Sequence, residues 1–362
     1  MKIAQIAPLV ESVPPRLYGG TERIVSYLTE ELVDQGHDVT LFASGDSQTS
    51  ARLVSCCPEA LRLTKVKDPL PYHLLMLDDV GRHADSFDVL HFHTDLVHYA
   101  IFRDVLPRTV TTLHGRLDCI GLPPLYHRFS DAPLVSISRS QRTPLPGSLN
   151  WAACIPHGLP HDMLRPLPSP AGSYLAFLGR ISPEKRPDRA IEIAAQVGRE
   201  LHIAAKIDAV DRDYWRCHIE PLVRRHPNVR YVGEINEREK ADFLGNAAAL
   251  LFPIDWPEPF GLVMIEAMAC GTPVIAWNNG SVPEVIDPGV TGFVVDSIAE
   301  AAVAVDAALR LDRRRIRAAF ERRFTAGRMA TDYVRLYRRL AGASDAPVHL
   351  LPTPAATLQA AE

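Results

Sequence analysis

The feature that most constrains the fold is an alternation of short apolar runs with helical patterns, which occurs twice along the chain. Because parallel strands need long crossover connections, such an alternation predicts βαβ units. In the first half a helix is predicted over Thr21–Gln35, where Ile24, Leu28 and Leu32 share one face. The strands predicted there are Ile3–Ala7, Val39–Ala43, Val89–Phe92, Thr109–Leu113, Leu134–Ile137 and Ala152–Ile155.

A proline-rich stretch over residues 156–170 interrupts this alternation, which then restarts. Strands are predicted at Leu175–Leu178, Leu201–Ala205, Val229–Val232, Ala248–Phe252 and Pro273–Ala276, and helices at Asp188–Val197, Asp211–Arg224, 236–246 and 260–270. The chain therefore reads as two α/β halves. We expect domains at residues 1–165 and 166–325, a helix over 326–341 that returns to the first domain, and a disordered tail over 342–362. A helical pattern covers Arg310–Leu340 as a whole.

Composition narrows the class of protein. The 362 residues are 47% hydrophobic, which excludes a disordered chain, and a net charge of −4 argues against a nucleic-acid binder. Six cysteines without a CxxC pair indicate reduced thiols. The N-terminus lacks the features of a signal peptide, no apolar run approaches about 20 residues, and we expect a cytoplasmic protein. The run Arg313-Arg314-Arg315 is better explained as a solvated helix face than as a membrane-binding patch, because the acidic residues Asp312 and Glu321 lie among the arginines of this segment. Peripheral membrane contact and the oligomeric state stay open.

The segment from Glu258 to Val274 carries the strongest candidate site. A buried strand leads into it, a helix follows from about Phe260, and Gly261 allows the backbone to approach a ligand. Glu266 falls among apolar residues of this helix and needs a partner. A structural ion pair and a carboxylate that accepts hydrogen bonds from ribose hydroxyls are about equally good explanations.

Three further loops follow predicted strands. Gly179-Arg180-Ile181-Ser182-Pro183-Glu184-Lys185 places two cations at a strand end, which suits a diphosphate, although an ordinary surface loop would look the same. Gly19 and Gly20 precede a helix and fit either a ligand-binding loop or a tight turn. His114, in Leu113-His114-Gly115, ends a strand, where histidines are more often structural than catalytic.

Together these motifs resemble the family 4 retaining glycosyltransferases of the GT-B fold. The resemblance is carried by EPFGLVMIEAMACGTPVIA, with seven residues between Glu258 and Glu266, by GRISPEKRPDRAIE, by the glycine loop and by TLHG. It covers about residues 1–340. It implies two Rossmann-like domains that face each other across a cleft, with the acceptor on the N-terminal side and the nucleotide-sugar donor on the C-terminal side.

The resemblance also implies roles for individual residues. Arg180 and Lys185 would bind the donor diphosphate, Glu266 the ribose hydroxyls, and Glu258 would lie near the donor sugar. The remaining implied contacts are backbone groups at Gly179, Phe260, Gly261 and Leu262, the loop at Gly19 and Gly20, and a hydrogen bond from His114 to the sugar 6-hydroxyl. The expected co-substrate is a UDP-, GDP- or ADP-hexose, with no metal or other cofactor. The acceptor is left open among carbohydrates, lipids and small molecules.

Several alternatives bear on this hypothesis. His157 stands where family members often have asparagine. Asp211-Arg212-Asp213 matches the letters of a metal-binding motif, but Asp211 is predicted to cap a helix. His91, His93, His114 and Asp95 resemble a metal-hydrolase cluster, which would need a barrel. A dehydrogenase is disfavoured because no glycine-rich dinucleotide fingerprint is present. A nucleotide-sugar epimerase on the same fold and a non-catalytic sugar-nucleotide binding protein remain as rival functions.

Overall fold

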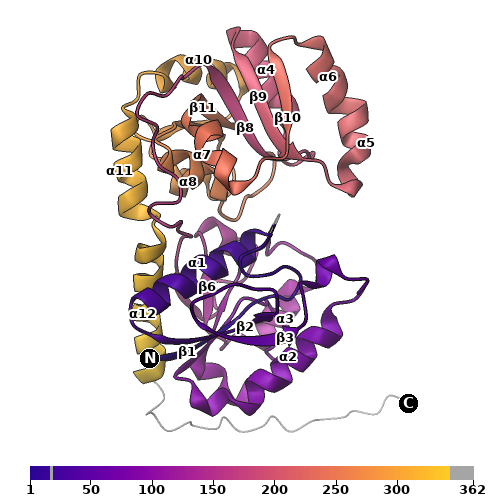
Figure 1. Ribbon diagram of the computed structural model, residues 1–362, viewed down its shortest axis with the longest axis vertical. Helices are drawn as coiled ribbons and strands as arrows, with labels where there is room; N and C mark the ends of the chain where they lie inside the picture. Colours follow the sequence, from indigo (N-terminus) through magenta and orange to yellow (C-terminus); the bar gives the residue numbers. More distant parts are fainter. Residues whose placement is uncertain (17–18, 343–362) are drawn as a thin grey trace, which may run out of the picture.

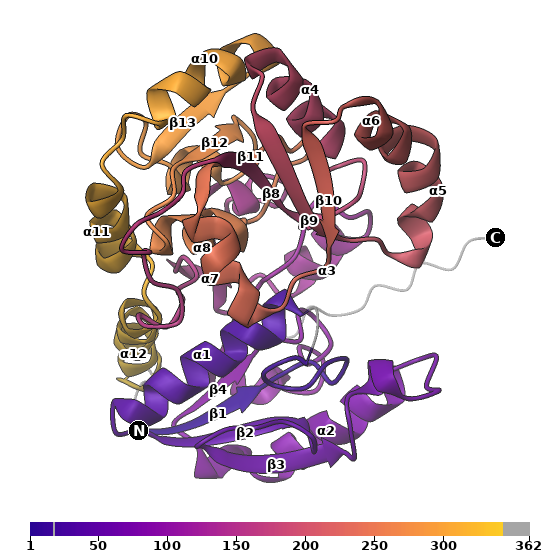
Figure 2. The same ribbon diagram turned by 45° about the horizontal axis from the view of Figure 1, so that its top comes forward.

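A computed structural model describes residues 1–16 and 19–342. Within them two parallel sheets lie one above the other, the lower built from the N-terminal half of the chain and the upper from the C-terminal half (Figures 1 and 2). The strand orders are β3-β2-β1-β4-β5-β6-β7 and β10-β9-β8-β11-β12-β13. Both orders reverse beside their first strand, and ligands bind at the carboxyl ends of parallel strands at such points. The two parallel α/β sheets expected from the sequence are confirmed.

The N-terminal sheet is covered by helices on both faces. Its strands are β1 (Lys2–Ile6), β2 (Asp38–Ser44), β3 (Arg52–Cys57), β4 (Val89–Phe92), β5 (Thr109–Thr112), β6 (Leu134–Ser136) and β7 (Trp151–Cys154). The α-helices within this half of the chain are α1 (Gly20–Asp34), α2 (Leu70–Arg82) and α3 (Leu122–Arg128). Short 3₁₀ turns occur at η1 (Leu61–Leu63), η2 (Ala84–Ser86), η3 (Arg103–Arg108) and η4 (Ser140–Arg142).

The C-terminal sheet has its own apolar core. Its strands are β8 (Tyr174–Arg180), β9 (Glu200–Lys206), β10 (Val229–Gly233), β11 (Ala247–Phe252), β12 (Val274–Trp277) and β13 (Gly292–Val295). Its helices are α4 (Pro187–Val197), α5 (Arg212–Tyr214), α6 (Glu220–Arg225), α7 (Glu237–Gly245), α8 (Leu262–Ala269), α9 (Val282–Val285), α10 (Ile298–Ala308) and α11 (Arg313–Arg323). The 3₁₀ turn η5 (Ala209–Asp211) precedes α5, and a π-helical turn, η6 (Trp215–Ile219), joins α5 to α6.

The last helix, α12 (Ala326–Gly342), belongs to the core of the N-terminal sheet although it ends the described chain. Met329, Tyr333 and Tyr337 are at most 1% exposed and pack with Ile24 and Leu28 of α1. Figures 1 and 2 both show α12 alongside α1. Burial of each such side chain contributes about 1.5–3 kcal/mol, which holds the helix on this sheet.

The chain thus crosses between the sheets twice, and the two crossings are hydrogen-bonded to each other. The amide of Leu159 donates to the carbonyl of Phe324 at 2.9 Å, and the amide of Ala326 donates back to Leu159 at 2.8 Å. A Cβ on Gly158 would lie 2.3 Å from the carbonyl oxygen of Thr325, so only glycine fits there. This bridge divides the predicted Arg310–Leu340 helix into α11 and α12.

Some elements differ from the sequence prediction. Strands β3 and β13 and helices α2, α3, α9 and α10 were not predicted. The helix expected from residue 260 begins at Leu262, because Gly261 at its N-terminus has φ = 80°. The domain boundary between residues 165 and 166 stays a prediction. The disordered tail was expected over 342–362, but Gly342 ends α12, and residues 343–362 lie outside the described part of the chain. No helix in the described residues is long and apolar enough to cross a membrane.

Candidate active site

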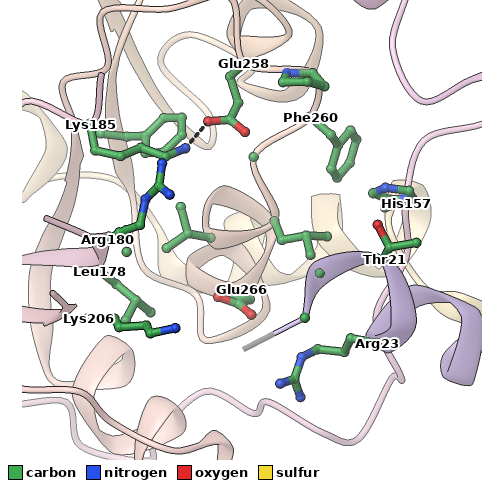
Figure 3. Close-up of a pocket in the computed structure, with 18 of the residues that line it drawn as sticks. Thr21, Arg23, His157, Leu178, Arg180, Lys185, Lys206, Glu258, Phe260 and Glu266 are labelled. Atoms are coloured by element: carbon green, nitrogen blue, oxygen red, sulfur yellow. Dashed lines mark hydrogen bonds and ion pairs between the residues drawn. The ribbon is translucent and has the colours of Figure 1, made fainter. Parts of the chain in front are cut away.

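A cavity of about 460 Å³ lies between the carboxyl ends of the two sheets. Residues from both halves of the chain line it. Figure 3 shows Arg180 and Lys185 on one side, Thr21 and Arg23 of α1 on the other, and Glu266 between them. All residues that were proposed from the sequence for the catalytic and donor sites line this cavity: Gly19, Gly20, His114, Gly179, Arg180, Lys185, Glu258, Phe260, Gly261, Leu262 and Glu266.

Arg180 ends β8 among acidic side chains. Its guanidinium forms an ion pair with Glu184, and it lies 3.7 Å from Asp208 and 3.8 Å from Asp211. A hydrogen bond from Lys206 lowers the pKa of Asp208, which keeps that carboxylate ionised. The guanidinium fork has five donors, so it can hold carboxylates and an entering phosphate together.

Lys185 is the second cation at this sheet edge. Its ammonium pairs with Glu258, and it lies 4.7 Å from the ring centre of Trp256. The side chains of Lys185 and Glu258 are only 19% and 11% exposed. A cation held against an aromatic face with little water around it interacts strongly with anions that enter the cavity.

The loop that carries Glu258 is fixed by backbone contacts. The amide of Ser281 donates to the carbonyl of Glu258 at 2.9 Å, and the Ser281 hydroxyl donates to the carbonyl of Phe260 at 2.8 Å. Gly280 has φ = 58°, and a Cβ there would lie 2.3 Å from the Glu258 amide nitrogen. Asn279-Gly280-Ser281 therefore acts as a clamp on the loop from Glu258 to Phe260.

Glu266 is 4% exposed and takes part in an ion-pair chain. Lys240 of α7 lies 2.7 Å from Glu266 and 2.6 Å from Glu237. Burial lowers the pKa of Lys240, but the two carboxylates outweigh it and raise that pKa above its ordinary value. Glu237 in turn lies 3.2 Å from Arg23 of α1, so the chain reaches the other sheet. The structural explanation of Glu266 thus holds, and the residue also lines the cavity.

Besides the cations Arg23 and Arg116, the N-terminal half presents two neutral histidines to the cavity. The rings of His114 and His157 stack with their centres 5.2 Å apart, and the His157 ring packs edge-on against Phe260 with the ring centres 5.0 Å apart. Burial lowers the pKa of His114 to about 3 and that of His157 well below its ordinary value, so both rings are neutral near pH 7. Across the cavity, a Cβ on Gly20 would lie 3.9 Å from Leu262.

Two sequence-based metal alternatives are not supported by the geometry. Asp211 makes no capping hydrogen bond, so the predicted cap is wrong; its carboxylate faces Arg180 because η5 turns it toward the end of β8. His91 and His93 are engaged in hydrogen bonds to protein side chains. Across residues 1–16 and 19–342 no group of three or more histidine, cysteine or acidic residues is placed to hold a metal ion.

Sequence reasoning missed several cavity residues. Trp256, Lys206, Arg23, Lys240 and Glu237 line it as well. Lys206 carried a usable signal, because it is a charge that directly ends the apolar strand β9. Arg23 lies three residues after Gly20 and was not singled out. Lys240 and Glu237 look like ordinary surface charges of a polar helix, and only the fold shows their partner Glu266.

Comparison with known proteins accounts for both halves of the chain. The model of the glycosyl transferases group 1 matches residues 167–323, and that of glycosyltransferase family 4 matches residues 18–155. The chain belongs to the family 4 glycosyltransferases. The resemblance seen in the sequence is therefore confirmed, and the pair of sheets is the GT-B fold of this family.

Curated relatives of this family 4 glycosyltransferase match only in part. A D-inositol 3-phosphate glycosyltransferase of Streptomyces scabiei is 34% identical over 164 residues, which cover 41% of this chain and 33% of the relative. One from Mycobacterium leprae is 33% identical over 147 residues, which cover 39% and 34%. The matched stretch thus spans about a third of the length of these relatives.

Solved structures match this family 4 glycosyltransferase over nearly its whole length. A glycosyltransferase involved in avilamycin A biosynthesis has a TM-score of 0.72 at 24% identity and covers 94% of this chain and 98% of its own. Sucrose-phosphate synthase from Thermosynechococcus elongatus has a TM-score of 0.76 at 21% identity, with coverage of 95% and 100%. Anabaena HepE in complex with UDP-glucose has a TM-score of 0.68 at 18% identity, with coverage of 95% and 99%. At these identities the likeness concerns the fold.

Proposed function

We propose that this protein transfers a hexose from a nucleotide diphosphate sugar to an acceptor hydroxyl, with retention of the anomeric configuration. The observation that carries the proposal is the pair of cations Arg180 and Lys185 in one cavity with Glu266, at the carboxyl ends of the C-terminal sheet. A diphosphate needs cations, and a ribose needs a hydrogen-bond acceptor for its hydroxyls.

The diphosphate is proposed to lie between Arg180, Lys185 and the N-terminal end of α8. The amides around Phe260, Gly261 and Leu262 are at this end, where backbone N–H groups lack helical partners and attract anions. Gly179 adds no side chain, and a Cβ there would meet nothing within 4 Å. Gly19 and Gly20, at the start of α1, are proposed to face the diphosphate from the other sheet. The site would use protein cations in place of a metal.

The ribose and the sugar are proposed to occupy the two ends of the same cavity. Glu266 would accept hydrogen bonds from the ribose hydroxyls while Lys240 keeps it ionised. Glu258 would face the donor sugar, where its charge supports positive charge that develops at the anomeric carbon. His114 would hydrogen-bond a sugar hydroxyl from the N-terminal side.

The reaction is proposed to proceed by front-face substitution. The bond between the anomeric carbon and the diphosphate oxygen breaks, the acceptor oxygen attacks the same face, and the leaving phosphate takes the acceptor proton. No strong general base is required. Arg180 and Lys185 stabilise the charge on the departing diphosphate, for which each preorganised donor contributes about 3–4 kcal/mol.

Similarity adds support from outside the chain. Solved neighbours with this fold include HepE in complex with UDP and glucose and a starch synthase bound to ADP and acarbose. The curated relatives are named as glycosyltransferases that act on D-inositol 3-phosphate. These names favour a nucleotide sugar as donor for the present protein.

The test is thermal unfolding with UDP, GDP and ADP. A diphosphate at about 100 times its dissociation constant adds about 2.7 kcal/mol of stability. One of the three is expected to stabilise the wild type but not Lys185→Ala. Lys67→Ala is the matched control, since Lys67 is an exposed lysine that does not line the cavity.

Turnover then separates the candidate functions. The matching nucleotide sugar is expected to release its diphosphate only when an acceptor is supplied, with an α-linked donor giving an α-linked product by NMR. Consumption of the donor without an acceptor would instead indicate an epimerase or a hydrolase. Stabilisation without any turnover would indicate a binding protein, and no stabilisation by any diphosphate would overturn the proposal.

A further inference from the structure

A buried chain of hydrogen bonds connects His114 in the cavity to the C-terminal helix α12. His114 Nε2 lies 2.9 Å from His93 Nδ1, and His93 Nε2 lies 2.8 Å from Oε1 of Gln5. The Gln5 amide nitrogen donates to the Tyr337 hydroxyl at 3.2 Å, and Tyr337 lies 2.7 Å from His91 Nδ1. Gln5, His91 and Tyr337 are 0% exposed, so the chain runs through the interior of the N-terminal sheet.

Gln5 determines which groups donate and which accept along this chain of hydrogen bonds. The Gln5 oxygen can only accept, so His93 donates to it through Nε2–H and keeps Nδ1 unprotonated. His93 Nδ1 then accepts, and His114 must donate to it through Nε2–H. Burial holds the pKa of His93 well below its ordinary value, which excludes a second proton on its ring near pH 7.

The same logic holds on the side of Tyr337. Its oxygen accepts from the Gln5 amide, so its own O–H is available to donate to His91 Nδ1. His91 then donates through Nε2–H to the hydroxyl of Thr112 at 2.7 Å. The four members between His114 and Thr112, which are His93, Gln5, Tyr337 and His91, therefore each have one donor and one acceptor role.

Because Nε2 of His114 carries the proton, the state of its other ring nitrogen, Nδ1, is also determined. Nδ1 of His114 is buried and has no hydrogen-bond partner among the described residues. With the proton on Nε2 and the ring neutral, Nδ1 carries a lone pair. It can accept a hydrogen bond from a hydroxyl in the cavity and cannot donate one.

We propose that Gln5 and Tyr337 are positioning residues that hold His114 in the tautomer with an unprotonated Nδ1, which then accepts a hydrogen bond from a hydroxyl of the donor sugar. The contact with the donor sugar rests on the proposed function, whereas the tautomer of His114 follows from the hydrogen bonds alone. Tyr337 does not line the cavity, so its effect on the donor must pass through the chain.

The test compares two variants of α12. Tyr337→Phe removes the hydroxyl between Gln5 and His91, which frees the Gln5 amide to turn and the proton of His114 to move to Nδ1. Tyr333→Phe is the matched control, because Tyr333 lies one turn away on the same helix and is 1% exposed. Its hydroxyl bonds only to the far end of the chain, at Thr112, at 2.8 Å, and the phenyl ring of the variant keeps the packing against His91. Both changes remove one buried hydroxyl.

Two readouts are needed. The ¹⁵N NMR shifts of labelled histidine rings report which nitrogen of His114 carries the proton. Calorimetry gives the ratio of affinities for UDP-glucose and UDP, which isolates the contribution of the sugar. We expect an unprotonated Nδ1 in the wild type and in Y333F, and a protonated fraction in Y337F. The affinity ratio should fall about fivefold in Y337F alone, as for one lost hydrogen bond.

The outcomes distinguish this inference from the proposed function. A wild-type His114 with its proton on Nδ1 overturns the inference, as do equal tautomers and equal affinity ratios in Y337F and Y333F when both nucleotides bind. If neither UDP nor UDP-glucose binds the wild type, the failure is that of the UDP-sugar function, and the NMR result still decides the tautomer. If Y337F does not fold, Gln5→Met breaks the chain at its other central member.

Discussion

The two faces of the cavity hold their polar groups in opposite ways. The face on the C-terminal sheet carries charges held by opposite charges, such as Lys185 with Glu258 and Arg180 with Glu184. The face on the N-terminal sheet includes the cations Arg23 and Arg116, but its histidines are neutral and are held by neutral hydrogen bonds. Charged pairs can exchange partners with an entering diphosphate, whereas a neutral network can only match the hydroxyls of a sugar or acceptor. The comparison thus supports a division of the donor between the two sheets.

The largest effect is expected at the charged face. Lys185→Ala should lower kcat/KM by about 100- to 1,000-fold, because the departing diphosphate loses a preorganised donor. Steady-state release of the nucleoside diphosphate measures this, with Lys67→Ala beside it. Unfolding without ligand separates the effect from damage to the fold, since Glu258 loses its partner. Normal turnover in Lys185→Ala would remove the charged face from the mechanism.

A smaller effect is expected from Glu266→Gln. Lys240 keeps Glu237 as a partner, so the variant should fold, while diphosphate affinity falls about 10- to 100-fold through loss of hydrogen bonds to a charged group. The comparison of each diphosphate with its 2′-deoxy form tests the reason. The wild type should distinguish the two, and Glu266→Gln should distinguish them less. An undiminished preference for the ribose form would assign Glu266 to the ion-pair chain alone.

The charged and the neutral face should also contribute to the free energy of unfolding over different pH ranges. Burial lowers the pKa of His98 and His114 to about 3 and places those of His91, His93 and His157 well below the ordinary value of 6.5. Each of these rings binds a proton below pH 6.5 in the unfolded chain but not in the folded one, so its contribution to the free energy of unfolding falls as pH decreases from 6.5 toward 3. Burial raises the pKa of Asp95 to about 6, and this carboxyl acts in the opposite direction. Asp208, whose pKa is lowered by Lys206, loses its contribution only when pH falls below about 4.

Calorimetric unfolding between pH 7 and 5 therefore measures the neutral face. Each buried histidine contributes up to about 1.4 kcal/mol per pH unit. His98→Gln should flatten the slope by that amount, because His98 is buried against Phe92 and outside the cavity. His83→Gln, at an exposed position, should leave the slope unchanged. An equal slope in His98→Gln and the wild type would mean that the His98 ring is not neutral in the folded protein.

The smallest effect on diphosphate affinity is expected at the ion pair between Arg23 of α1 and Glu237 of α7, which joins the two faces. Arg23→Gln breaks the 3.2 Å contact with Glu237, and a partly exposed pair of this kind contributes about 0.2–1 kcal/mol. Diphosphate affinity should change by less than about fivefold and the change should shrink in high salt. Small-angle scattering without ligand is expected to show a slightly more open molecule. A change larger than that of Glu266→Gln would mean that closure, and not ribose binding, controls affinity.

The sequence predicted the charged face better than the neutral one. Arg180, Lys185, Glu258 and Glu266 follow apolar strands within short motifs, so local order reveals them. The hydrogen bonds of His114 depend on Gln5 and Tyr337, which are separated by 332 residues, and no local pattern links them.

The missed strands have a similar physical reason. Strands β3 and β13 are edges of their sheets, and each has half-buried positions in place of a continuous apolar run. The other two edges, β7 and β10, have similar burial and were predicted, so edge position lowers the signal without removing it. Central strands such as β11 are buried throughout and were predicted. The break between α11 and α12 was missed because it depends on a contact with Leu159 in the distant linker.

The position of α12 also has a consequence for how the protein is made. Synthesis runs from the N-terminus, and domains usually fold as they emerge. Here the first sheet to be synthesised needs Met329, Tyr333 and Tyr337 to complete its core, and these are among the last described residues to leave the ribosome. The second sheet has its core residues between Ile137 and Phe324, so it can close first. The N-terminal sheet is therefore synthesised first, but its core is completed last. The apolar surface of the nascent chain must be kept from aggregating until α12 has been synthesised.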